Sequence, residues 1–320
     1  MKNKVKSILI DLELEGNGVV NYDSGDQKWV LKNVDFNGDH NNNVSYAKKN
    51  FYKSDNPDEK MSYKLKISSN CIHKSTFNDM VALTGSVTHN RDMLLMYISH
   101  PSSIMSGYLF PTLNLKKKSP ISLTDAEQTC NAVSKLELFT RSGEKVKNET
   151  DEDGKKKSDN SLFKKETVGD IKYRAKGVID LTELQFISGD QKFDRQSFLN
   201  DEGEKFLEKL KLILPDPNGI EFGDYVIDGT SVNIPESGIL LSEKNVEWLT
   251  KYYLTKLLET YIHRKNSYAR VSSMKIKYVE KVTTDTFSND RNWIKIDSLE
   301  DIEKLEFSTH KKYVPHSIHL

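Results

Sequence analysis

The chain has 320 residues, of which 36% are hydrophobic and 29% charged, so it is long and apolar enough to bury a substantial core. This length allows one large domain or two smaller ones. Its 47 basic and 47 acidic residues cancel, which argues against a uniformly basic nucleic-acid-binding surface but leaves room for one basic groove.

The N-terminal part begins with a strand pattern. Apolar residues at 8, 10, 12 and 14 alternate with acidic residues, which is the period of a half-buried strand. Residues 35–62 are rich in Asn, Asp, Lys and Ser and predict an inserted or flexible loop. The further elements predicted here are a strand at 63–67, a helix at 71–83, a buried segment of undecided type at 93–98 and a β-like segment at 107–115.

The middle of the chain holds a second low-order segment, which we predict as an inserted or flexible loop over residues 141–165. Its part from 141 to 160 is charged and almost without apolar residues. Strands and helices then mix without strict alternation, which favours an α+β fold. The elements predicted after the loop are an apolar restart at 178–181, helices at 196–214 and 242–263, and a strand at 271–279.

Signatures of metal and cofactor chemistry are weak. If Gly154 takes position six of an EF-hand loop, Asn160 falls where the bidentate glutamate belongs. Residues 16–18 lack the third glycine of a dinucleotide-binding fingerprint. The eight histidines are scattered, so we expect no cofactor and no metal. A histidine-based ribonuclease stays open, because its acid and base need not be close in sequence.

The cysteines and the hydropathy pattern bear on the compartment. Cys71 and Cys130 are the only cysteines, which rules out a disulfide framework and a Cys-x-x-Cys metal site and favours the reducing cytoplasm. No apolar run reaches the roughly 18 residues that span a bilayer, so a membrane partner is not expected.

Three stretches favour contact with a nucleic acid. A helix starting near Asn70 can hold a phosphate on its free N–H groups, with Lys74 one turn further on; a capped surface helix is the alternative. Lysines at 116–118 add positive charge. Residues 184–195 place cations, amides and aromatic side chains around Gly189, which suits a sugar-phosphate backbone and stacked bases.

Several motifs together resemble one known family. They are residues 18–21, 67–72 with Phe77, 106–108 with Pro111, 117–123, 167–170, 184–188, 192–195 and 236–241. They span roughly residues 8–260, and residues 184–195 are the most specific part. With these motifs the chain resembles the crRNA-backbone subunit of type I CRISPR surveillance complexes (Cascade), especially the type I-F variant.

The resemblance implies a single domain over residues 1–320, an RNA-recognition-motif-like (RRM-like, ferredoxin-like) palm of the RAMP superfamily with large loop and hairpin insertions. Copies of such a subunit stack into a helical filament along one crRNA, and a protruding hairpin displaces a nucleotide at regular intervals. The held guide pairs with target DNA, so base pairing reads the sequence. The implied partners are crRNA, target DNA through the guide, other copies of the chain and other CRISPR-complex subunits.

The resemblance also implies site residues, all of them for RNA binding and none catalytic. The helix start departs from the family pattern, because His73 and Lys74 stand where the family has Arg-His. A neutral His73 weakens one phosphate contact, and Lys74 restores the charge. The implied residues are Ser68, Asn70, His73, Lys74, Lys117, Lys118, Ser119, Gln185, Phe186, Lys192, Arg195, Tyr268 and Arg270.

Two other functions remain open at this point. Related type III backbone subunits cleave target RNA through an acidic residue in a loop after the first strand, and Asp23 and Asp26 lie in such a place. An aspartate beside Gly25 in a turn is usually structural, which favours a subunit that does not cleave. The second alternative is a protein scaffold without nucleic acid, in which the lysines and Arg195 are solvated surface.

Overall fold

The structure is a computed structural model that describes residues 4–17, 66–79, 87, 90–130, 134–142, 160–168, 170–191, 195–229, 234–264, 267–283, 286–287 and 291–316. Within these residues the largest sheet has the strand order β14-β15-β2-β10-β7-β3, with β16 added to β15 and β6 to β10. Its eight strands are β2 (Ser7–Asn17), β3 (Lys66–Ile67), β6 (Ile121–Leu123), β7 (Ala126–Gln128), β10 (Asp170–Asp180), β14 (Tyr261–Arg264), β15 (Ser267–Val279) and β16 (Ile294–Ile296).

Strand β2 is the strand that the sequence pattern predicts, and it lies in the middle of this sheet. Ile8, Ile10, Leu12 and Leu14 are fully buried on one face, and both neighbours, β10 and β15, pair with it in antiparallel fashion along most of its length. The acidic residues between them point to the opposite face, because successive side chains of a strand alternate. The helices pack on the apolar face.

The longest helix shows how far periodicity predicts. Val246, Leu249, Tyr253 and Leu257 are all fully buried, and Ser242 caps the helix by accepting a hydrogen bond from the N–H of Asn245. The predicted helix 242–263 extends too far, because the helix ends at Leu258 and residues 261–264 form strand β14. The described helices are α1 (Ser69–Thr76), α2 (Arg91–Ser99), α3 (Pro101–Ser106), α4 (Leu181–Leu184), α5 (Gly203–Ile213), α6 (Glu243–Leu258) and α7 (Leu299–Glu303).

Other predicted elements differ from the structure. The undecided segment 93–98 belongs to α2, and the β-like segment 107–115 contains β4 (Tyr108–Phe110) and ends at the first residue of its hairpin partner β5 (Leu115–Lys117). Helix α5 begins only at Gly203, because the preceding backbone forms strand-like contacts. The carbonyl of Gln196 accepts from Lys116, and the N–H of Ser197 donates to Ser188.

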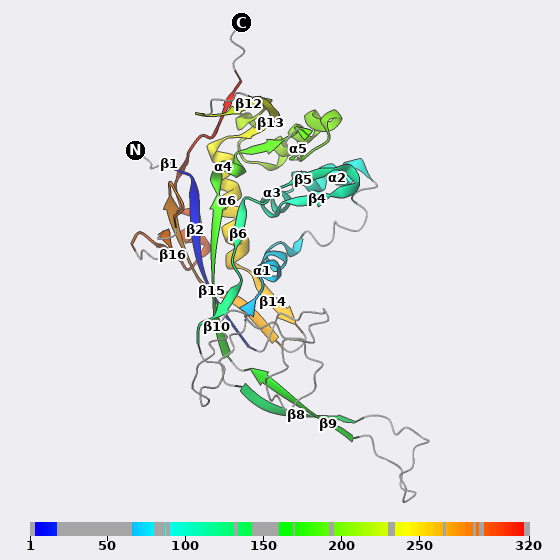
Figure 1. Ribbon diagram of the computed structural model, residues 1–320, viewed down its shortest axis with the longest axis vertical. Helices are drawn as coiled ribbons and strands as arrows, with labels where there is room; N and C mark the ends of the chain where they lie inside the picture. Colours follow the sequence, from blue (N-terminus) through cyan, green and yellow to red (C-terminus); the bar gives the residue numbers. More distant parts are fainter. Residues whose placement is uncertain are drawn as a thin grey trace, which may run out of the picture.

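The predicted loop over residues 141–165 is partly wrong. Strands β8 (Ser134–Ser142) and β9 (Asn160–Val168) pair along their whole length, so residues 141–142 and 160–165 are strand. This hairpin extends away from the end of the main sheet (Figure 1). Residues 143–159 lie outside the described residues, as does the predicted loop 35–62.

A second, four-stranded sheet lies at the other end of β2 and β10 (Figure 1). Its order is β11 (Phe186–Ser188), β13 (Glu236–Leu241), β12 (Ile220–Ile227) and β18 (Tyr313–Pro315). The short strands β1 (Lys4–Val5) and β17 (Ser308–Thr309) pair in parallel. This mixture of helices and antiparallel sheets confirms the α+β class. In the described part of the chain, no helix is long and apolar enough to cross a membrane.

Candidate nucleic-acid interface

In the block 184–195, Gln185 and Phe186 contact the segment 310–313 near the C-terminus. The side-chain Nε2 of Gln185 donates to the carbonyl of His310 (2.7 Å), and its Oε1 accepts from the N–H of Lys312 (3.2 Å). Phe186 is only 6% exposed and stacks on Tyr313 with ring centroids 4.4 Å apart. These two predicted RNA-binding side chains therefore pack against the protein itself.

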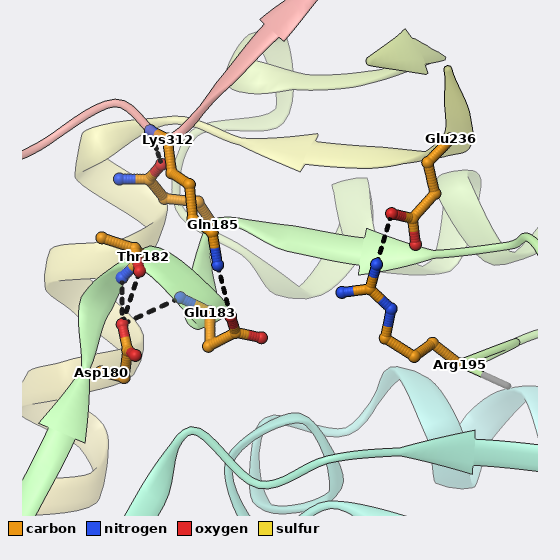
Figure 2. A network of polar contacts seen from close by, with 7 residues as sticks. All are labelled: Asp180, Thr182, Glu183, Gln185, Arg195, Glu236 and Lys312. Atoms are coloured by element: carbon orange, nitrogen blue, oxygen red, sulfur yellow. Dashed lines mark hydrogen bonds and ion pairs between the residues drawn. The ribbon is translucent and has the colours of Figure 1, made fainter. Parts of the chain in front are cut away.

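Charged side chains gather beside this packing: Glu183 with Lys312 and Glu236 with Arg195, while the charge of Lys118 acts on Glu183. We call these five residues, Lys118, Glu183, Arg195, Glu236 and Lys312, the Glu183 cluster. Lys312 forms an ion pair with Glu183, and Arg195 forms one with Glu236 at 2.7 Å. Figure 2 shows both pairs in one view. Burial raises the pKa of Glu183, but the bond to Lys312 and the charges of Lys312, Arg195 and Lys118 outweigh burial and hold this pKa below its usual value.

Helix α4 positions Glu183 within this cluster. Asp180 ends strand β10 and caps the helix, because its Oδ1 accepts from the N–H groups of Thr182 (2.9 Å) and Glu183 (3.2 Å) (Figure 2). Burial lowers the pKa of Lys312, but the bond to Glu183 together with the charges of Tyr313, Glu183 and Asp180 outweighs burial and raises this pKa, so Lys312 stays charged. The cluster has three cations and two carboxylates, and its cations can form charge-assisted hydrogen bonds with a phosphate.

Only one of the three residues predicted at 117–119 is an exposed cation. Lys117 is the last residue of β5 and is buried, whereas Lys118 follows the strand and is exposed. Burial lowers the pKa of Lys117 to about 8, although the charge of Glu183 opposes this shift. The hydroxyl of Ser119 donates to the carbonyl of Met105 at 2.8 Å. Lys117 and Ser119 are therefore structural in this geometry.

The predicted phosphate position at the start of α1 holds a carboxylate of the chain itself. Ser68 caps the helix, and Oδ1 of Asp125 accepts from the N–H of Ser69 at 2.9 Å while Lys66 pairs with the same carboxyl group. Burial raises the pKa of Asp125, but the bonds to Lys66 and Ser69 lower it more, so the group is ionised. An anion already occupies this helix end, and Asn70 is exposed beside it.

The other end of α1 lies against the segment that carries Lys118. Nε2 of His73 lies 3.3 Å from the carbonyl oxygen of Ser106, and burial lowers the pKa of His73 although this contact opposes the shift. The next residue, Gly107, has φ +71°, and a Cβ there would lie 2.6 Å from the Lys117 carbonyl oxygen. Lys74 is exposed on α1, but no contact in the described part of the chain joins it to the Glu183 cluster.

Tyr268 and Arg270 lie elsewhere on the molecule. Arg270 Nε donates to Glu15 at 2.9 Å on the sheet face away from the helices, and Tyr268 stacks on Tyr261 with centroids 6.1 Å apart. Glu15 is eight residues from Ser7, which pairs with Asp180 at the cluster's end of the sheet. At 3.3 Å per residue this is roughly 26 Å. The structure does not bring these two residues to the cluster, and Lys192 lies outside the described residues.

The sequence interpretation missed Glu183, Glu236 and Lys312. The basic and aromatic run from His310 to Tyr313 was a usable signal for Lys312. The two glutamates carried no such signal, because their role depends on cations that reach them from distant parts of the chain.

Residues 4–304 match the family described as Type I-Fv CRISPR-associated protein Cas7fv-like, and the chain belongs to this family. The resemblance drawn from the sequence is thereby confirmed. The chain is a Cas7-type subunit of a type I CRISPR surveillance complex, with crRNA and other subunits of that complex as partners. No curated protein matches the sequence.

Two solved structures are similar to the chain. One is a "CRISPR RNA-guided surveillance complex", with a TM-score of 0.39 and 9% sequence identity. The match covers 92% of this chain and 80% of the chain in that structure. The other, a "CRISPR RNA-guided surveillance complex, pre-nicking", has a TM-score of 0.42 and 7% identity and covers 87% of this chain and 78% of its own.

Proposed function

We propose that the chain is the non-catalytic, crRNA-binding backbone subunit of a cytoplasmic type I CRISPR–Cas complex. Copies assemble along the guide RNA and present it for pairing with target DNA, so that base pairing rather than the protein reads the sequence. The observation that carries this proposal is the family match over residues 4–304.

The fold supports an RRM-like palm within this function. Along the chain the elements run β2, α1, β7, β10, α6 and β15, and in the sheet the order is β15-β2-β10-β7. This is the succession of a β-α-β-β-α-β ferredoxin-like unit. The β8–β9 hairpin is an insertion between β7 and β10, and we assign it the role of the protruding hairpin that displaces guide nucleotides.

The Glu183 cluster is the best-supported contact for the guide backbone. Lys118, Arg195 and Lys312 come from three separate parts of the chain, and the charge of each acts on the carboxylate of Glu183. When three cations bind the phosphodiester backbone, condensed counterions are released from the RNA. The affinity then depends on the salt concentration and not on the base sequence. Lys74 and His73 on α1, and Lys192, are further contacts within this proposal.

The balanced net charge is compatible with self-assembly. On the sheet face away from the helices, the acidic strand β2 is flanked by basic residues, and the ion pairs Arg174–Asp11 and Arg270–Glu15 join them. A subunit that packs against its own copies needs faces of both signs, together with a local basic groove. A uniformly basic surface would oppose such packing.

Purification with and without a CRISPR array tests the function. With the array, we expect the chain to carry RNA of uniform length, seen as a raised ratio of absorbance at 260 to 280 nm and as one band on a denaturing gel. Protein that joins the complex without RNA would contradict the proposal and favour the scaffold alternative.

The same preparation tests the absence of catalysis. The purified complex is incubated with labelled complementary RNA and Mg²⁺, and we expect this RNA to stay intact. Metal-dependent cuts at regular intervals would show an endonuclease instead. In that case Asp23 and Asp26, which lie outside the described residues, become the first positions to replace.

A further inference from the structure

The C-terminal segment 308–315 lies beyond the family match but packs against residues of the candidate site. The match ends at residue 304, whereas β17 and β18 follow at 308–309 and 313–315. Strand β17 pairs with β1, and β18 pairs with β12 at the edge of the four-stranded sheet. The end of the chain therefore joins the N-terminal strand to the second sheet.

Side chains fix this strand on both sides of Lys312. Gln185 uses its donor on the carbonyl of His310 and its acceptor on the N–H of Lys312. Tyr313 is 3% exposed and packs in a small core with Phe186 and Tyr225. The backbone is thus hydrogen-bonded at His310 and at Lys312 itself, and the next residue, Tyr313, is packed in a core. The position of Lys312 is therefore fixed by the fold.

The ammonium group of Lys312 points into the Glu183 cluster. It pairs with Glu183, lies 5.4 Å from the centre of the Tyr313 ring, and its side chain is 25% exposed. An ammonium group has three N–H donors, so the Glu183 carboxylate does not exhaust it. The charges of Arg195 and Lys118 act on the same carboxylate.

We propose that the C-terminal segment 308–315 is a working part of the guide site, in which Lys312, between β17 and β18, contacts a phosphate of the single-stranded guide RNA together with Lys118 and Arg195. This inference rests on the proposed function and adds a residue that the family match does not contain. The contact is made by charge, so the ligand is the phosphodiester backbone of any RNA sequence.

The alternative is that the Lys312–Glu183 ion pair is only structural. The two roles predict opposite changes in RNA affinity for the variant Glu183→Gln. If Lys312 only attaches the strand to Glu183, then Lys312→Gln and Glu183→Gln break the same bond and weaken RNA binding alike. If Lys312 binds phosphate, Lys312→Gln weakens binding, whereas Glu183→Gln removes a competing anion and strengthens it. Lys311 is an exposed neighbour with the same charge and serves as the matched control.

The test measures binding of the full-length protein to fluorescein-labelled oligouridylate by anisotropy between 50 and 300 mM salt. We expect Lys312→Gln to weaken binding on the order of fivefold and to lower the salt slope by about 0.7, with Lys311→Gln near wild type. Lys312→Arg should restore binding, which separates lost charge from lost folding. Equal behaviour of Lys312→Gln and Lys311→Gln, or weaker binding in Glu183→Gln, would overturn the inference. Wild-type protein that does not bind RNA would overturn the proposed function itself.

Discussion

Neutralising Lys118 and Arg195 together is expected to remove guide RNA from the purified protein without unfolding it. Arg195 pairs with Glu236, which is 4% exposed, so loss of the arginine alone would leave a buried carboxylate without its partner. The variant therefore combines Lys118→Gln, Arg195→Gln and Glu236→Gln. Two lost phosphate contacts should lower the slope of log affinity against log salt by about 1.4. Anisotropy on single-stranded RNA measures this slope.

A second pair of lysines provides the control. Lys172 lies on the sheet face away from the helices and Lys211 on α5, and both are exposed. Replacing both with glutamine changes the net charge by −2, whereas the triple variant changes it by only −1. If overall charge governs binding, the control loses more RNA. If the Glu183 cluster governs binding, the triple variant loses more, and the opposite order would contradict the proposed site.

Lys117→Met is expected to stabilise the protein at pH 7 by about 3 kcal/mol, because burial lowers the pKa of this lysine from 10.5 to about 8. Below pH 8 both the folded and unfolded states bind the proton, and the folded state bears the full cost of burying the charge. Between pH 8 and 10.5 the folded state releases the proton while the unfolded state keeps it, so the wild type gains stability. Urea unfolding at pH 7 and pH 10 should show the advantage of the variant at pH 7 and its near loss at pH 10.

RNA binding by the same variant separates two roles of Lys117. Since its side chain is 7% exposed, Lys117→Met should retain RNA as well as the wild type. The exposed neighbour Lys116 is the control for stability, and Lys116→Met should change the free energy of unfolding by less than about 0.5 kcal/mol. Loss of RNA in Lys117→Met, or lower stability at pH 7, would return Lys117 to the guide contacts.

Local periodicity predicted the elements that build the core. The alternation around Ile8 to Leu14 and the helical spacing from Val246 to Leu257 both describe one buried face of one element, and the structure confirms both. The resemblance likewise identified the family. These features are readable because each lies within a single stretch of chain.

The site was harder to predict, because its contacts join distant residues. Gln185 and Phe186 looked like contacts for a guide, but their partners lie about 125 residues later in the chain. The helix start at Ser69 looked open to a phosphate, but Asp125 reaches it from 56 residues away. Lys117 is the last residue of β5 and is buried, whereas Lys118 follows the strand and is exposed. The sequence of a three-residue strand does not define which of its side chains face inward.

Mapping of RNA–protein photo-crosslinks in the assembled complex tests the central claim most directly. The account predicts crosslinked peptides that contain Lys118, Arg195 and the segment 310–316, with none from the sheet face that carries Lys172 and Arg270. Crosslinks found only on that opposite face, with none at Lys118, Arg195 or Lys312, would contradict the claim that the Glu183 cluster binds the guide.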